Sequence, residues 1–146
     1  MKLSRSICLR IVKNISKSNY NYEPLNYEKW VEYININSNI FIWYENTPEG
    51  QKTLQSINDF PIEYRERILL SLNKLLCFMD FSPKKGYHNI NIAFNPDDNW
   101  ILIGFERKPT KKDLTFFLQM AKYLDALLVL GDRKIIDEKV LAALED

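Results

Sequence analysis

One stretch decides the fold of this chain: His88-Asn-Ile-Asn-Ile-Ala-Phe-Asn-Pro-Asp-Asp-Asn-Trp-Ile-Leu-Ile-Gly-Phe-Glu106. The apolar residues Ile90, Ile92 and Phe94 alternate with small or polar ones, a period of two that is typical of a strand with one buried face. Residues 100–105 are largely apolar on both faces, as expected of a central strand. Between the two arms, residues 95–99 are turn formers. The stretch therefore predicts an antiparallel hairpin in the middle of a sheet.

The length and composition of the chain are those of one globular domain. It has 146 residues, of which 46% are hydrophobic and 27% charged, which is enough for a core and unlike a disordered segment. The formal net charge is +1 at pH 7. This balance supplies no long-range field for nucleic acid or an anionic membrane, although it leaves room for a local basic patch.

The N-terminal residues carry positive charge but no apolar run typical of a signal peptide, because Arg10, Lys13 and Lys17 interrupt it. No segment approaches the roughly 18 consecutive apolar residues that a membrane-spanning helix needs. We therefore expect a cytoplasmic protein that makes no contact with a membrane.

Other segments of the chain predict further strands and helices. The apolar residues of 7–12 predict a short strand, and its basic neighbours favour the edge of a sheet; residues 1–26 otherwise read as an irregular N-terminal arm. Periodic apolar residues predict the clearest helix over 61–79 and another over 110–125. Further strands are expected at 40–44 and 126–130, although the latter could also continue the preceding helix, and further helices at 27–34, 47–57 and 138–144. Thr47 is the expected N-cap of the helix at 47–57, and Thr110 with Asp113 resembles a capping box at the start of the helix over 110–125.

The order of these elements predicts the fold class. We expect a single α+β domain, residues 1–146, built on a mostly antiparallel sheet of four or five strands. The helices at 61–79 and 110–125 should cover one face of that sheet.

The sequence has little that is typical of a catalytic or metal site. His88 is the only histidine, so no multi-histidine metal site can form, and no nucleophile elbow or phosphate-binding glycine loop is present. We therefore interpret His88 as structural or exposed and expect no enzyme activity and no cofactor. Asp97 and Asp98 are interpreted first as turn residues, with a partner-facing acidic knob as the alternative.

The two cysteines, Cys8 and Cys77, each lie among apolar neighbours. This placement favours buried free thiols over a disulfide or a reactive thiol. Gly104 interrupts the second arm of the hairpin, which indicates a bulge or the close approach of a helix.

Two groups of residues are candidates for contact with a partner. Lysines and Arg107 flank the hairpin at 84–88 and 107–112, which should lie at the same end of the sheet and could bind nucleic acid, with Tyr87 stacking on a base. Aromatic residues with a polar handle are common at protein interfaces, and Trp30, Tyr20, Tyr22 and Tyr27 are the better interface candidates, whereas Trp43 and Trp100 are expected in the core.

The segment Phe116-Phe-Leu-Gln-Met-Ala-Lys-Tyr-Leu-Asp-Ala-Leu-Leu-Val-Leu-Gly-Asp-Arg-Lys-Ile-Ile136, which follows the hairpin, resembles a tail of small bacterial immunity proteins. These proteins neutralise polymorphic toxins or toxins of contact-dependent growth inhibition. The resemblance covers about a third of the chain and consists mostly of hydrophobic pattern. It implies a cytoplasmic protein without catalytic activity that binds one cognate toxin, such as a nuclease.

Two hypotheses follow from the sequence. The first is a toxin-binding immunity protein, whose acidic interface residues would be Glu45, Glu49, Asp97 and Asp98, with Trp30 as an aromatic contact. The second is a small nucleic-acid-binding protein that uses the basic end at 84–88 and 107–112.

Overall fold

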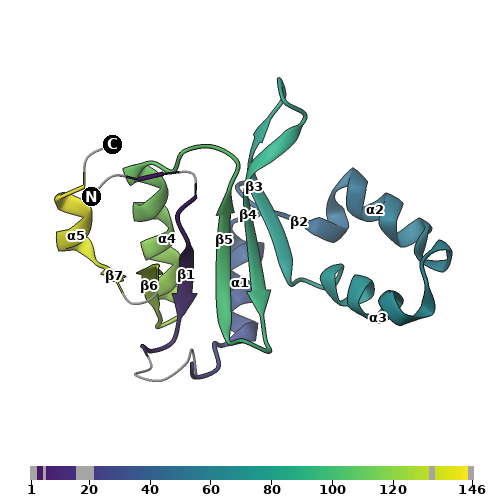
Figure 1. Ribbon diagram of the computed structural model, residues 1–146, viewed down its shortest axis with the longest axis horizontal. Helices are drawn as coiled ribbons and strands as arrows, with labels where there is room; N and C mark the ends of the chain where they lie inside the picture. The colour runs from purple at the N-terminus through teal and green to yellow at the C-terminus, as the bar shows by residue number, and fades with distance from the viewer. Residues whose placement is uncertain (1–2, 5, 16–21, 132–133, 145–146) are drawn as a thin grey trace.

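The computed structural model of this chain describes residues 3–4, 6–15, 22–131 and 134–144. It is an α+β domain built on one antiparallel sheet of seven strands in the order β2-β3-β4-β5-β1-β6-β7 (Figure 1). The fold class was predicted correctly, but four or five strands were expected. The strands are β1 (Leu9–Val12), β2 (Ile42–Trp43), β3 (Leu76–Ser82), β4 (Tyr87–Asn95), β5 (Trp100–Phe105), β6 (Leu127–Leu130) and β7 (Lys134–Ile136).

Five α-helices and two short 3-10 helices are found among the described residues. They are α1 (Tyr27–Ile36), η1 (Tyr44–Asn46), α2 (Pro48–Gln55), η2 (Ile57–Asp59), α3 (Ile62–Ser71), α4 (Lys111–Tyr123) and α5 (Glu138–Ala142).

The predicted hairpin is confirmed as β4 and β5, near the middle of the sheet. The two strands pair in antiparallel register from Ile90 opposite Phe105 to Asn95 opposite Trp100. The connection is an Asx-type turn, in which Asn95 Oδ1 accepts hydrogen bonds from the backbone N–H groups of Asp97 and Asp98, each at 3.0 Å. The turn interpretation of the two aspartates is therefore correct.

The prediction that residues 7–12 form an edge strand is wrong. The described strand β1 pairs with β5 on one side and β6 on the other, so it is central. Arg10, which lies within the strand, points to the sheet face opposite Leu9 and Ile11, which are buried in the main core. There its guanidinium donates to the backbone oxygen of Gly131 at 2.7 Å and lies 5.0 Å from the Trp100 ring centroid.

Helices α1 and α4 cover one face of the sheet, behind the strands in Figure 1. Trp30 of α1 packs against Phe94 of β4 with ring centroids 5.8 Å apart, and Phe117 of α4 meets Phe105 of β5 at 6.2 Å. The main hydrophobic core lies between these helices and the sheet. The helix predicted at 110–125 is thus confirmed as a cover, and 126–130 is a strand rather than a continuation of that helix.

The helix predicted over 61–79 is wrong in its second half. The helix α3 ends at Ser71, Lys74 adopts a left-handed conformation with φ of 57°, and residues from Leu76 onward form strand β3. Leu76 to Ser82 pair with β4, and this long-range pairing overrides the local helical pattern. As a result α3 does not cover the sheet. It lies with α2 in a lobe that projects beyond the β2–β3 edge, at the right of Figure 1.

Candidate functional site: an exposed helix and an aromatic cleft

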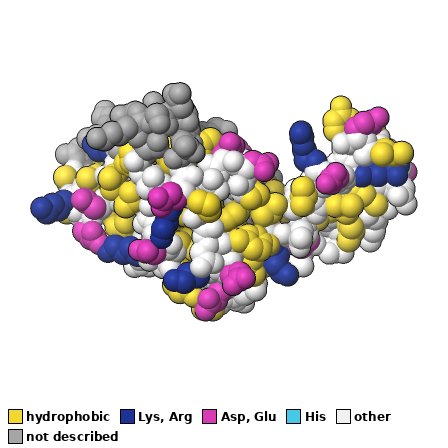
Figure 2. Space-filling model, turned by 90° about the horizontal axis from the view of Figure 1, so that it is seen from below, with side chains coloured by type: hydrophobic (Ala, Val, Ile, Leu, Met, Phe, Trp, Pro, Cys, Tyr) yellow, Lys and Arg dark blue, Asp and Glu magenta, His cyan; other side chains and the backbone are white. Residues whose placement is uncertain are grey.

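Helix α3 is the most exposed apolar element among the described residues. None of its ten residues is buried. Ile62 is 76% exposed, Leu70 51% and Leu69 45%, and their spacing places them along one side of the helix, where with Arg65 and Glu66 they line a shallow surface hollow. Figure 2, which views the molecule from below, shows hydrophobic side chains gathered on this projecting lobe.

The start of α3 is fixed by its preceding loop rather than by burial. The Arg65 guanidinium turns back and donates to the backbone oxygens of Phe60 and Asn58, each at 2.9 Å. A helix of this length is marginal on its own in water, and contiguous exposed apolar surface of this kind is typical of a binding face. The lobe therefore presents a helix whose apolar side has no partner in the described parts of the chain.

A second feature is an aromatic cleft of about 610 Å³ where the lobe joins the sheet. It is bounded by η1 and the start of α2 on one side and by the β3–β4 hairpin on the other, and the end of β5 contributes as well. Five of its eleven lining residues are aromatic, two are carboxylates and one is an amide: Tyr44, Thr47, Pro48, Glu49, Phe78, Phe81, Gly86, Tyr87, His88, Asn91 and Glu106.

The aromatic rings of this cleft are in contact with one another. His88 stacks on Phe78 with centroids 5.5 Å apart and lies 5.0 Å from Phe81, while Tyr44 meets Phe78 edge-on at 6.0 Å. Burial lowers the pKa of His88 below its ordinary value, against the opposing influence of the Glu49 and Asp80 carboxylates. His88 is thus part of an aromatic wall, and it is neutral at pH 7.

The side of the cleft formed by α2 is held by close backbone packing. Thr47 Oγ1 donates to the backbone oxygen of Tyr44 at 2.6 Å and accepts from the N–H of Gly50 at 3.0 Å, so it caps α2 as predicted. A Cβ at Gly50 would lie 1.9 Å from the backbone oxygen of Tyr44. Only glycine permits this approach, which places Tyr44 and Glu49 at the cleft.

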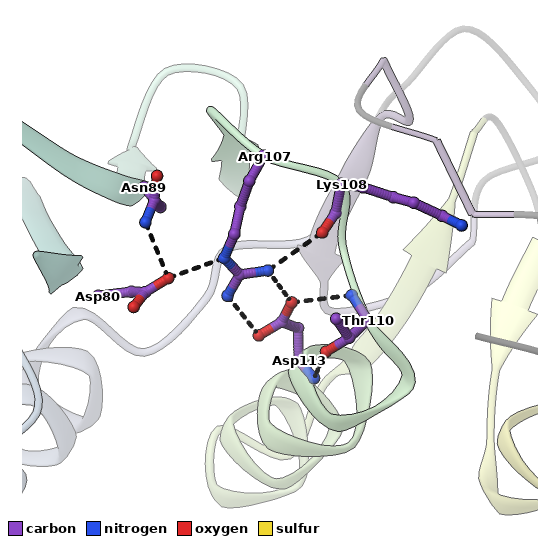
Figure 3. Close-up of polar contacts among 6 residues, drawn as sticks. All are labelled: Asp80, Asn89, Arg107, Lys108, Thr110 and Asp113. Atoms are coloured by element: carbon purple, nitrogen blue, oxygen red, sulfur yellow. Dashed lines mark hydrogen bonds and ion pairs between the residues drawn. The ribbon is translucent and has the colours of Figure 1, made fainter. Parts of the chain in front are cut away.

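The predicted basic end is partly neutralised (Figure 3). The Arg107 guanidinium forms two hydrogen bonds to the carboxylate of Asp113, at 2.7 and 3.0 Å, and a third to Asp80 Oδ2 at 2.8 Å. Asp80 also accepts from Asn89, and Asp113 completes the predicted capping box of α4 with Thr110. Arg107 therefore joins the β3–β4 hairpin to the start of α4, and the basic end is left with its lysines.

This network determines the ionisation of Asp113. Burial alone would raise the pKa of its carboxyl, but the Arg107 hydrogen bonds and charge, together with those from Thr110, hold the pKa below the ordinary value. Hydrogen bonds to Asp113 and Asp80 likewise raise the pKa of Arg107, against the effect of burial. Both groups are fully charged at neutral pH.

The predicted interface residues do not form one surface. Trp30 is fully buried, packs against Trp43 and Phe94, and donates from Nε1 to the backbone oxygen of Lys74 at 3.0 Å. The prediction that it contacts a partner is wrong, because its side chain has no exposed surface. Tyr22 is also buried, against Trp100, whereas Tyr20 lies outside the described residues.

The four acidic residues are likewise separated. Glu45 Oε2 accepts the backbone N–H of Lys74 at 2.7 Å and so braces the chain between α3 and β3. Glu49 lines the aromatic cleft beside the start of β4, while Asp97 and Asp98 follow the end of β4. A nine-residue strand separates these two points by roughly 25 Å. Of the five residues predicted for the toxin interface, the cleft contains only Glu49; Tyr87, which was predicted to stack on a base, also lines it. Its other aromatic residues come from distant segments whose proximity no local pattern predicts.

Several absences hold for the described residues only. No group of three or more His, Cys, Asp or Glu side chains there could hold a metal ion. Nor does that part of the chain contain a helix that is long and apolar enough to cross a membrane.

Cys77 is buried as predicted, but Cys8, just before β1, is exposed, so the prediction of burial is wrong for Cys8. Comparisons with protein-family models, curated proteins and solved structures find no match.

Proposed function

We propose that this chain is a non-catalytic binding protein that acts in the cytoplasm as an immunity protein, by holding a cognate bacterial toxin in an inactive complex. The observation that carries the proposal is helix α3, which keeps Ile62, Leu69 and Leu70 in solvent. A helix that buries none of its own residues gains packing energy only when another molecule covers it.

The chemistry of α3 favours a partner with an apolar binding surface. Arg65 and Glu66, which flank the apolar residues, carry opposite charges, so the face has no strong net field. Interface cores are depleted in charge and rich in large side chains, and a few of them carry most of the binding energy. The expectation that the acidic residues form one interface gains no support, because Glu49 lies far from Asp97 and Asp98.

The experiment is a protection assay in bacteria that express the toxin domain encoded beside this gene. Wild-type protein should restore growth, and the double change Ile62→Asp with Leu69→Asp should abolish protection, because both side chains would be desolvated beside apolar partner groups. The matched control is Ile36→Asp. Ile36 ends α1, away from the lobe, and is 65% exposed, so this variant should protect like the wild type.

A purified complex gives the quantitative form of the same test. Truncation of a central apolar contact typically costs 2 kcal/mol or more, about a thirtyfold loss of affinity. Equal protection and equal affinity for the α3 and Ile36 variants would contradict the proposal. So would turnover of a substrate by the pure protein that a single side-chain change removes.

A further inference from the structure

The aromatic cleft combines three kinds of group that together select a particular ligand. Ring faces of Phe78, Phe81 and Tyr87 supply apolar surface with negative electrostatic potential. The carboxylates of Glu49 and Glu106 supply negative charge, and Asn91 supplies an amide. Within the described residues, the Glu49 carboxylate takes part in no hydrogen bond or ion pair.

We propose that this cleft binds the guanidinium group of an arginine side chain presented by a partner protein. A guanidinium is planar, stacks on aromatic rings, and donates two parallel hydrogen bonds to a carboxylate such as that of Glu49. Cation binding by these rings is already visible at the rim, where the Lys85 ammonium lies 5.7 Å from the centroid of the Tyr87 ring.

The electrostatics of the cleft favour a cation over an anion, although the Lys85 ammonium lies at its rim. Phosphate groups, and with them a nucleic acid, would be repelled by the two carboxylates at close range. The positive end of α2 does not attract an anion into the cleft, because Thr47 occupies the N–H of Gly50 and Glu49 lies in the first turn. Since His88 is neutral at pH 7, it adds no charge that would oppose a cation.

The floor of the cleft keeps Asn91 available for this ligand. Asn91 lies opposite Gly104 in the β4–β5 ladder, and its amide occupies the space where a Gly104 side chain would stand. The missing side chain thus lets Asn91 lie flat on β5 beside the rings, where its carbonyl can accept from a guanidinium. The prediction that a helix approaches Gly104 is wrong, because the close neighbour is the Asn91 side chain of the adjacent strand.

The inference is tested by NMR, because His88 is the only histidine in the chain and its imidazole signals report on the cleft alone. The probe is arginine blocked as an amide at both backbone ends, which mimics a residue within a protein. The control probe is blocked citrulline, which has nearly the same shape without the charge. The protein variant is Glu49→Gln, and the matched variant is Glu63→Gln on the exposed surface of α3.

Blocked arginine should shift the His88 signals saturably, with an affinity at least about fivefold higher than that of blocked citrulline. The Glu49→Gln variant should lose most of this difference in affinity, whereas the Glu63→Gln variant should keep it. Equal binding of the two probes, or no saturable shift, would overturn the inference. If agmatine, a free guanidinium compound, bound at least tenfold tighter than blocked arginine, a small metabolite rather than a protein would be the ligand.

This inference goes beyond the proposed function and does not require the partner to be a toxin. The variant with Ile62→Asp and Leu69→Asp leaves the cleft intact, so it should bind blocked arginine like the wild type. If the wild-type protein bound arginine but failed to protect against the toxin, the result would count against the proposed function alone. If it protected but bound no arginine, the result would count against the cleft alone.

Discussion

The side chain of Asn91 lies over Gly104 on the neighbouring strand, so closely that a Cβ at Gly104 would come within 2.7 Å of Asn91 Oδ1. The two residues are direct partners in the antiparallel ladder. This pair connects the central hairpin to the aromatic cleft. Gly104 leaves space above β5, and Asn91, which fills that space, lines the cleft.

Gly104→Ala should therefore displace Asn91 rather than unfold the protein. The conflicting atoms are at the end of a flexible side chain, so we expect a loss of stability of no more than about 1–2 kcal/mol, measured by urea unfolding. Binding of blocked arginine should weaken several-fold. The control is Leu102→Ala, at a 41% exposed position of the same strand. Unchanged arginine binding in Gly104→Ala would remove Asn91 from the site.

Gly50→Ala should damage the lobe more severely, because its Cβ would meet backbone. The nearest atom is the carbonyl oxygen of Tyr44 at 1.9 Å, and no rotamer change relieves that contact. We expect a loss of about 2–3 kcal/mol, the upper part of the range for overpacking, and faster proteolysis within residues 44–72. Gln55→Ala, an exposed helical substitution in α2, should change stability by less than about 0.5 kcal/mol. Comparable effects of the two would refute the packing argument.

Arg107→Met should destabilise the protein in a pH-dependent way. It leaves the buried Asp113 carboxylate without its cation, which we expect to cost about 3 kcal/mol at pH 7. The folded-state pKa of Asp113 lies below its unfolded value of about 3.9, so the stabilisation is complete above that unfolded value and is lost as pH falls through the folded-state pKa. The difference between wild type and variant should thus be largest at neutral pH.

Urea unfolding at a series of pH values between 7 and 2 measures this difference. It should shrink as pH falls below about 4, because Asp113 takes up a proton first in the unfolded chain and then, at lower pH, in the folded wild type. Lys108→Met removes a neighbouring exposed cation and should show almost no loss at any pH. A pH-independent difference for Arg107→Met would mean that Arg107 acts by packing and not by charge.

Local patterns predicted the hairpin, the cap at Thr47 and the helix over 110–125, because each depends on neighbours in sequence. The helix over 61–79 failed because Leu72, Leu76 and Met79 continue a helical spacing, while pairing of β3 with β4 decides the structure there. The central place of β1 was missed because the basic residues that flank it suggested an edge, and its partner strands β5 and β6 are remote in sequence.

The candidate site was hidden for the same reason. The apolar periodicity that includes Ile62 and Leu69 is typical of a helix face buried in the core, so it does not predict that these side chains are exposed. The cleft is assembled from segments around residues 44–49, 78–91 and 106, so its chemistry exists only after the sheet has formed. Of its lining residues, only Glu49 and Tyr87 were predicted as contacts, Glu49 for a toxin and Tyr87 for a nucleic acid.

Hydrogen exchange of the amides of α3 tests the central claim, that this helix is the face a partner covers. In the free protein, amides of residues 62–71 should exchange much faster than those of α4, whose residues Leu114 and Phe117 are fully buried. In the complex with the partner purified from the native host, exchange of residues 62–71 should slow by about tenfold or more. Unchanged exchange in α3, with protection at another surface of this chain, would contradict the account.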